Sequence, residues 1–297
     1  MDLRTFQGVL PPLLTPFEDD GSVDAEGVKN IVNHVIERGA DGLFPAGSTG
    51  EGPCLTLCQW EALIAATARA ARGRVPVFAG CIDTSLPRVM EKVKRAGKLG
   101  ADAVVITPPF YFTFFNTDDI VAHYASILKE SPVPVVAYNI PQCTHNALSV
   151  DGFERIAASR KLVGLKDSSG DWATFQLLLD VCKTHGIALL QGSESQSASA
   201  VLLGASGIVP GFGNYHPRLA KELYLAAASG NIAASMELQR KARKVSQIWR
   251  VTRFPYVAGK VALNIMGLCG TKTTVPERAT AEQRKRIRQI LLDTGAI

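Results

Sequence analysis

The sequence predicts an α/β protein built as a (β/α)8 barrel with a C-terminal helical extension. Short, nearly continuous apolar runs recur eight times before residue 211, as buried parallel strands do. Their spacing of roughly 20–34 residues leaves room for a loop and a helix in each unit. The length of 297 residues suits one such barrel with additions.

The eight expected strands are apolar and rich in β-branched residues, and they cover residues 9–14, 42–45, 75–79, 103–106, 133–137, 162–165, 187–190 and 207–210. Strict alternation of strand and helix predicts a mostly parallel sheet. Eight units can close into a barrel. A doubly wound open sheet is the alternative that the same alternation permits.

The helices between these strands begin at side chains that cap a helix N-terminus. Thr56 with Gln59, and Asn116 with Asp119, have the spacing of a capping box. The expected barrel helices cover residues 25–38, 57–72, 117–130 and 172 to about 185, and a further one starts after Ser85.

After the eighth strand the pattern is entirely helical, over residues 217–229, 232–250, 255–268 and 280–293, with a bend at 270–278. The first of these helices completes the barrel. We therefore expect a catalytic barrel over residues 1–230 and a helical extension, packed on it, over residues 231–297. No linker long enough to separate a second domain is present.

Composition indicates an ordinary globular protein, with 46% hydrophobic and 20% charged residues. No apolar stretch approaches the roughly 18 residues of a membrane span, and the N-terminus lacks the pattern of a secretory signal. The six cysteines form no C-x-x-C pair. We expect reduced thiols and a cytoplasmic location.

The net charge of +5 is mildly basic, with runs of basic residues at 240–244 and 284–288. Both runs lie in amphipathic helical patterns, where they form a solvated face. We therefore expect no nucleic-acid partner, although basic patches can bind one. A positive field also suits a small anionic substrate.

Catalytic residues of such barrels lie at the C-terminal ends of the strands. Lys166 follows the sixth apolar run, which places its amine at the mouth of the barrel. Burial favours the neutral amine, which can attack a ketone to form an imine. The alternative is a buried ion pair between Lys166 and Asp167.

Other strand ends carry further candidates. Tyr138 follows the fifth run and is either a proton carrier or a core aromatic residue. The loop at 47–51 combines glycines with the hydroxyls of Ser48 and Thr49, so it is either an anion-binding nest or a tight turn. The aromatic loop at 107–115 needs a cover, either a second subunit or a substrate lid.

The sequence lacks the motifs of several other catalytic chemistries. The five histidines lack metal-ligand spacing, so no metal is expected. The loop at 47–51 is not a P-loop, and no G-x-S-x-G elbow is present. A thiol nucleophile at Cys143 beside His145 is disfavoured, because nothing orients the imidazole.

Together the strand ends resemble the dihydrodipicolinate synthase / N-acetylneuraminate lyase family of pyruvate-dependent class I aldolases. The matching segments fall in order along almost the whole chain: Thr-Pro-Phe at 15–17, Gly-Ser-Thr-Gly-Glu at 47–51, Pro-Phe-Tyr at 109–111, Tyr-Asn-Ile-Pro at 138–141, Gly-Leu-Lys-Asp-Ser-Ser-Gly-Asp at 164–171 and Gly-Ser-Glu at 192–194.

The resemblance implies that Lys166 forms a Schiff base with pyruvate and that Tyr138 shuttles protons. Ser48 and Tyr111 would complete a hydroxyl relay, Tyr111 reaching in from a neighbouring subunit of a homotetramer. Ser48 and Thr49 would hold the pyruvate carboxylate. The remaining substrate contacts would come from Gly192, Val209, Cys143, Ser168 and Glu194. No cofactor is implied.

Departures from the family pattern bear on the substrate. Dihydrodipicolinate synthases of this kind carry an Arg where this chain has Cys143, and a thiol cannot pair with a second carboxylate. The strand-eight end, Val-Pro-Gly at 209–211, lacks the Ser expected of sialate lyases. We therefore expect an aldolase or dehydratase of 2-keto-3-deoxy sugar acids. The alternatives are dihydrodipicolinate synthase and a non-catalytic ligand-binding barrel.

Overall fold

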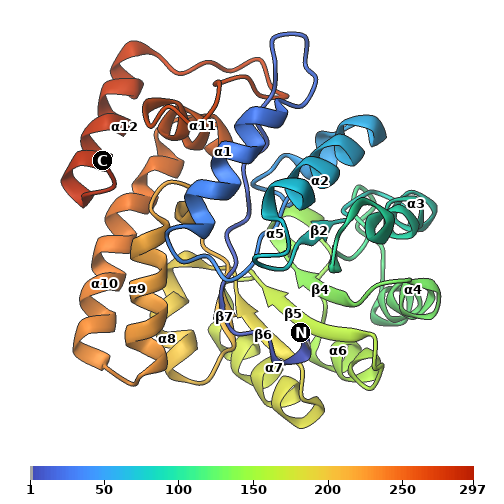
Figure 1. Ribbon diagram of the computed structural model, residues 1–297. Coiled ribbons are helices and arrows are strands. Elements are labelled where there is room, and N and C mark those ends of the chain that lie inside the picture. The colour runs from blue at the N-terminus through green and yellow to red at the C-terminus, as the bar shows by residue number, and fades with distance from the viewer. Residues whose placement is uncertain (1–2) are drawn as a thin grey trace.

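The computed structural model describes residues 3–297, and its centre is a curled parallel sheet surrounded by helices (Figure 1). Its strands are β1 Gly8–Val9, β2 Phe78–Gly80, β3 Ala103–Ile106, β4 Val135–Asn139, β5 Leu162–Asp167, β6 Ala188–Gln191 and β7 Gly207–Ile208. They lie in the order β1-β7-β6-β5-β4-β3-β2, and every pair of neighbours is parallel.

Single bridges close the sheet between its two edge strands. Phe44 pairs in parallel with Pro12, just after β1, and Leu43 pairs in parallel with Val77, just before β2. The strand expected at 42–45 is thus reduced to bridges, because Pro12 has no N–H to donate and the residue after Phe44 is also a proline. The ring is nevertheless closed, so the barrel prediction is confirmed and the open sheet is excluded.

The α-helices described within residues 3–297 are α1 Ala25–Ile36, α2 Leu57–Ala71, α3 Leu86–Ala96, α4 Thr117–Glu130, α5 Pro141–Thr144, α6 Val150–Ala157, α7 Trp172–His185, α8 Ser197–Leu202, α9 Pro217–Ala228, α10 Ile232–Val245, α11 Pro255–Ile265 and α12 Ala281–Thr294. The 3₁₀ turns are η1 Leu3–Thr5, η2 Gly52–Cys54, η3 Gly97–Leu99, η4 Glu194–Gln196, η5 Gly211–Asn214 and η6 Ser246–Arg250.

The predicted capping boxes are present, whereas Ser85 precedes α3 without a side-chain hydrogen bond to the helix. Both capping boxes form, at the starts of α2 and α4. The helix expected over 232–250 is α-helical only to Val245 and continues as the 3₁₀ turn η6. Helices α5, α6 and α8 were not predicted individually, because with four, eight and six residues they are shorter than the window of about 11 residues over which helical periodicity is recognised.

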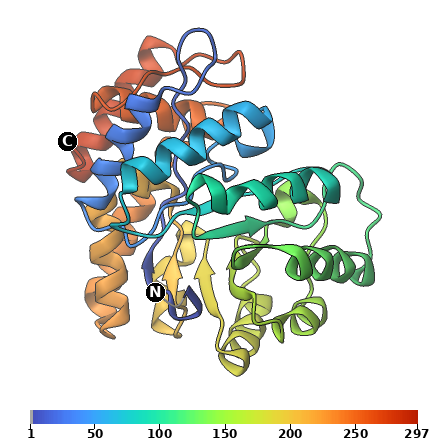
Figure 2. The same cartoon turned by 45° about the vertical axis from the view of Figure 1, so that its right-hand side comes forward.

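The N-terminal turn η1 covers the end of the barrel at which the strands begin (Figure 2). Leu3 and Phe6 join the same interior cluster as Leu10, Phe44 and Val105. Large apolar side chains therefore fill the end of the barrel at which the strands begin. Each fully buried one contributes about 1.5–3 kcal/mol of transfer free energy. A cavity lined by strand-end residues lies toward the opposite end.

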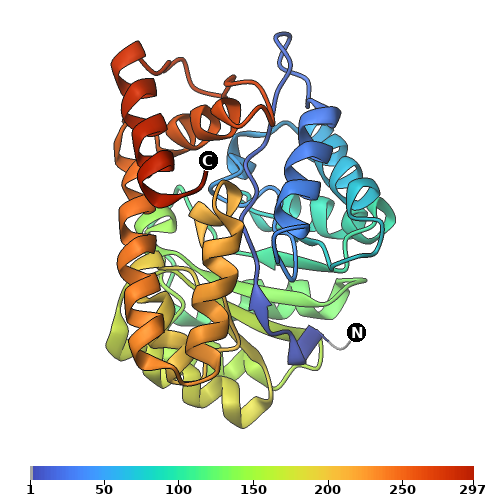
Figure 3. The same ribbon diagram turned by 60° about the vertical axis from the view of Figure 1, so that its left-hand side comes forward.

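Helices α9 and α10 lie side by side, and α12 packs on α10 and α11 (Figure 3). Helix α11 contacts η5, which follows β7, and also η6. None of the helices described between residues 3 and 297 is both long and apolar enough to cross a membrane.

Candidate active site

A cavity of about 520 Å³ opens at the end of the barrel where the strands finish. Strand ends contribute Tyr138, Lys166, Gly192 and Val209 to its wall. The segments that follow the strands contribute Ser48, Thr49 and Ser168, together with Cys143 of α5 and Glu194 of η4. The fold therefore brings together every predicted site residue except Tyr111.

Lys166 lies on β5 with only 5% of its surface exposed. Its Nζ is 3.8 Å from the centre of the Tyr138 ring and 4.9 Å from that of Phe44. Burial lowers the pKa of Lys166 to about 7, against the opposing influence of the Cys143 and Asp167 charges. An amine with this pKa is partly neutral, and so nucleophilic, near pH 7.

The Asp167 side chain points to other partners. Its carboxylate accepts hydrogen bonds from Asn139 Nδ2 at 2.7 Å and from Ser169 Oγ at 2.9 Å. Among residues 3–297, no acidic group lies within ion-pair distance of Lys166. The alternative reading of Lys166 as half of a buried ion pair is therefore wrong.

Tyr138 lies on β4 and is buried beside the Lys166 amine. Burial raises the pKa of its hydroxyl, whereas hydrogen bonding with Ser168 and Ser48 lowers it. The phenol is thus protonated at neutral pH and joined to two other hydroxyls. A protonated phenol next to an amine can deliver a proton to an oxygen that leaves the same carbon.

The loop that carries Ser48 and Thr49 is held in an unusual backbone conformation. Ala46 and Glu51, on either side of the two hydroxyl residues, have φ values of 57° and 60°. Non-glycine residues in this region carry strain of about 1–3 kcal/mol each and persist only where the surroundings enforce them. At Gly52 a Cβ would lie 1.9 Å from the Ala46 oxygen, so the turn needs a glycine there.

Gly192 is a second position with no room for a side chain. A Cβ at this position would lie 2.0 Å from Ser168 Oγ and 2.9 Å from Lys166 Cε. The Gly192 N–H donates a hydrogen bond to the backbone carbonyl oxygen of Asp167 at 2.7 Å. This bond fixes the end of β6 against the end of β5. The missing side chain therefore leaves the space beside the amine open to a ligand.

Glu194 lines the cavity, but its carboxylate is already bound by the protein. Oε1 accepts from the Phe212 N–H at 2.9 Å and from Trp249 Nε1 at 3.1 Å, and Oε2 accepts from Ser246 Oγ. Burial raises the pKa of Glu194, whereas these three donors lower it. The carboxylate joins the cavity wall to η6 of the C-terminal helices.

The C-terminal helices also supply cavity residues that the sequence analysis missed. Trp249, Pro255 and Tyr256 line the cavity. None of the three follows a strand, because Trp249 belongs to η6 and Pro255 and Tyr256 belong to α11. Aromatic residues near the start of a helix carry no signal of their own, since most such residues belong to a core.

Tyr111 lies outside the cavity. It is 78% exposed with φ at 84°, and the neighbouring Phe112 and Phe114 are 59% and 86% exposed. The loop borders a separate, largely apolar hollow of about 680 Å³ beside α4.

His145 is also exposed and does not line the Lys166 cavity. No thiol–imidazole pair therefore forms with Cys143 in the part of the chain described.

Across residues 3–297, no group of three or more His, Cys, Asp or Glu side chains is placed to hold a metal ion. The six cysteines, all within this range, form no disulfide. The cavity therefore brings together the Lys166 amine, several hydroxyls, the Cys143 thiol and the Glu194 carboxylate. Such a set can form and protonate a carbon–nitrogen adduct of a carbonyl compound.

Comparison with known proteins agrees with this geometry. The profile of the dihydrodipicolinate synthetase family matches residues 5–292. The chain belongs to this family. It is therefore a class I lyase of the lysine Schiff-base type, as the resemblance implied.

Individual members of the dihydrodipicolinate synthetase family align with almost the whole chain. The 4-hydroxy-tetrahydrodipicolinate synthase of Phenylobacterium zucineum is 31% identical over 295 residues, 98% of each chain. A DapA-like lyase of Halobacterium salinarum, uncharacterised, is 32% identical and covers 98% of this chain and 94% of its own. The dihydrodipicolinate synthase structure from Bacteroides thetaiotaomicron has a TM-score of 0.92 and 33% identity, with coverages of 97% and 98%.

Proposed function

We propose that this family member acts on pyruvate-type 2-oxo acids through an imine on Lys166. The observation that carries the proposal is the Lys166 amine itself: buried, without an ion pair, with its pKa lowered to about 7 and facing a cavity. Each of these features makes the amine a better nucleophile near neutral pH.

In the proposed reaction, the Nζ lone pair attacks the keto carbon and forms a carbon–nitrogen bond. The former carbonyl oxygen takes up protons and leaves as water, so the ketone and the amine become an imine. Tyr138 is placed to deliver and recover the proton, with Ser48 and Ser168 as neighbours in the hydroxyl chain. The imine then withdraws electrons from the adjacent carbon, which permits carbon–carbon bond formation or cleavage.

The carboxylate of the 2-oxo acid would bind at the loop that carries Ser48 and Thr49. Both residues line the same cavity as Gly192. Hydroxyls and successive backbone N–H groups bind a single carboxylate well. Val209 and Ile140 would contact the methyl or methylene side of the ligand.

There are two candidates for the second substrate. The names of the relatives favour 4-hydroxy-tetrahydrodipicolinate synthase, the alternative of the sequence analysis, over a sugar-acid enzyme. One observation favours a 2-keto-3-deoxy sugar acid instead: Cys143 lines the cavity where an Arg would pair with a second carboxylate. The thiol is a weak donor, and burial raises its pKa, so it stays neutral.

We also propose that the aromatic loop docks on a second copy of the chain, within a homotetramer in the cytoplasm. Three large aromatic residues within four positions, Tyr111, Phe112 and Phe114, are exposed. Such a patch is costly in water and favours burial against another surface. In such an assembly Tyr111 would reach the neighbouring cavity.

Pyruvate with borohydride, followed by mass measurement of the protein, tests the imine. A panel of aspartate semialdehyde with pyruvate, and of 2-keto-3-deoxy acids alone, then identifies the second substrate. We expect a borohydride-stabilised adduct on the wild-type protein. A protein that gains no mass at saturating pyruvate would rule the proposal out.

A further inference from the structure

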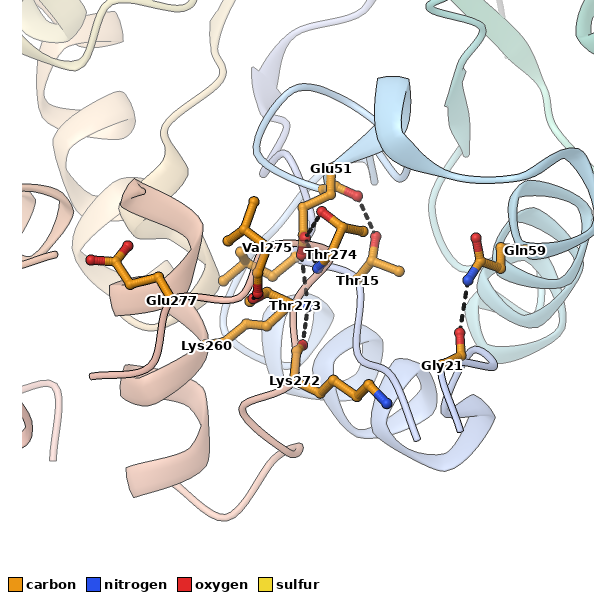
Figure 4. Close-up of polar contacts among 12 residues, drawn as sticks. Thr15, Gly21, Glu51, Gln59, Lys260, Lys272, Thr273, Thr274, Val275 and Glu277 are labelled. Atoms are coloured by element: carbon orange, nitrogen blue, oxygen red, sulfur yellow. Dashed lines mark hydrogen bonds and ion pairs between the residues drawn. The ribbon is translucent and has the colours of Figure 1, made fainter. Parts of the chain in front are cut away.

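A fully buried ion pair lies directly behind the Ser48–Thr49 loop. Lys260 Nζ is 2.7 Å from Glu51 Oε1, and both side chains are 0% exposed. Glu51 belongs to the loop, whereas Lys260 belongs to α11 of the C-terminal helices. Figure 4 shows the two side chains meeting between these segments, which are more than 200 residues apart in the sequence.

Both charged groups have further partners in the protein besides each other. Glu51 Oε2 accepts hydrogen bonds from the Thr274 N–H and the Thr274 Oγ, each at 2.7 Å. Lys260 Nζ also donates to the backbone carbonyl oxygen of Lys272 at 2.5 Å and lies 4.2 Å from the centre of the Phe17 ring. The pair thus ties the loop to two C-terminal segments, α11 and residues 272–274.

The pair acts on the backbone that carries the cavity hydroxyls. The Glu51 backbone is itself in the left-handed region of φ, and its N–H donates to the backbone carbonyl oxygen of Ser48 at 3.2 Å. A second tie, from Thr15 Oγ1 to the Gly50 oxygen at 2.6 Å, holds the other side of the turn. Moving the Glu51 carboxylate would therefore move Ser48 and Thr49, which are three and two residues away.

Helix α11 faces the cavity as well. Tyr256 lines the cavity one helical turn before Lys260, so both residues lie on the same side of α11. The wall formed by Tyr256 and the loop pinned by Lys260 consequently share one rigid support. A purely stabilising ion pair has no need of this placement, and buried pairs are in general poor sources of stability.

We propose that the Glu51–Lys260 pair positions the Ser48–Thr49 loop to bind the carboxylate of the 2-oxo acid. This role rests on the function proposed above, in which that loop is the carboxylate site. Both residues are positioning residues, since neither lines the cavity. The C-terminal helices thereby set the affinity of the barrel for its substrate.

The test measures the pyruvate concentration that half-saturates borohydride trapping, and the trapping rate at saturation. Glu51→Gln keeps the shape of the side chain but removes the charge that holds Lys260. Thr274→Val is a milder change that removes one hydrogen bond to Glu51 and leaves the pair intact. The matched control is Lys92→Met, because Lys92 is also buried, pairs with Asp83 at 2.9 Å and donates to the Ile82 oxygen at 3.1 Å, away from the cavity.

We expect Glu51→Gln to raise the half-saturating pyruvate concentration at least tenfold, since small misplacements of binding groups cost up to about 10²-fold. Thr274→Val should raise it roughly threefold, and the saturated trapping rate should change less in both. Lys92→Met should lower the melting temperature without changing pyruvate affinity.

If wild type is trapped and both loop variants, folded, keep its half-saturating concentration, the positioning role is wrong. An equal rise in Lys92→Met would also overturn it, because the effect would then be general instability. If wild type is not trapped at all, the proposed function fails first, and the positioning role falls with it.

Discussion

Tyr138 and Lys166 are register partners on the neighbouring strands β4 and β5, and the Lys166 Nζ lies 3.8 Å from the centre of the Tyr138 ring. Parallel pairing places the two side chains at the same height in the barrel. An amine and a phenol that reach one point in the cavity can act on a single carbon. This relationship underlies the proposed division of roles between nucleophile and proton carrier.

The lowered pKa of Lys166 predicts the pH dependence of imine formation. The ordinary value is 10.5, and burial brings it to about 7. Only the neutral amine attacks, so the trapping rate at saturating pyruvate should rise with pH and level off above about 7. Below that point it should fall about tenfold per pH unit. A rate that still rises steeply between pH 8 and 10 would contradict the lowered pKa.

Removing the Tyr138 hydroxyl should reduce turnover strongly. Tyr138→Phe keeps the ring that packs on Phe44 at 6.2 Å, so the fold should remain. General acid–base groups contribute typically 10²–10⁴-fold, and a loss in this range is expected in pyruvate release or condensation. Circular dichroism and the melting temperature serve as controls. A loss of less than about tenfold would assign the proton transfer to another group.

The absence of a side chain at residue 192 should be essential to the site. In Gly192→Ala the new Cβ would collide with Ser168 Oγ and approach Lys166 Cε. We expect imine trapping to fall by at least tenfold, since the amine or the ligand must shift. Gly230→Ala is a surface control, although its φ of 73° adds backbone strain. Normal trapping in Gly192→Ala would show that the amine has more room than this geometry allows.

Cys143 bears on the choice of second substrate. Cys143→Arg would place a planar cation in the cavity wall, and charge-assisted, paired hydrogen bonds are roughly twice as strong as neutral ones. We expect the variant to condense aspartate semialdehyde with pyruvate at least about tenfold more efficiently than wild type. A wild-type kcat/KM of about 10⁴ M⁻¹s⁻¹ or more for this condensation would establish the synthase activity and exclude the sugar-acid expectation.

The sequence was sufficient to predict the barrel and the residues at the strand ends, because local patterns encode both. The run before Lys166 is apolar, and Thr56 and Asn116 cap their helices through neighbours three residues away. Long-range contacts were not predictable in this way. No local signal connects Glu51 with Lys260, and Trp249 reaches the cavity only because η6 packs against the barrel end.

The same distinction explains the weaker points of the sequence analysis. The strand at 42–45 has the right apolar pattern, but prolines in its partner segment limit it to bridges. The family resemblance predicts Glu194 as a substrate contact, and that role stays a prediction. Its three protein donors become visible only when residues 212, 246 and 249 are brought beside it.

The most direct test of the central claim is the site of covalent labelling. Wild type and Lys166→Ala are each incubated with pyruvate and borohydride, and intact mass is followed by peptide mapping. We predict a mass gain in wild type on the peptide that contains Lys166 and none in the variant. A Lys166→Ala protein that is still labelled, or wild type labelled on another lysine, would contradict the account.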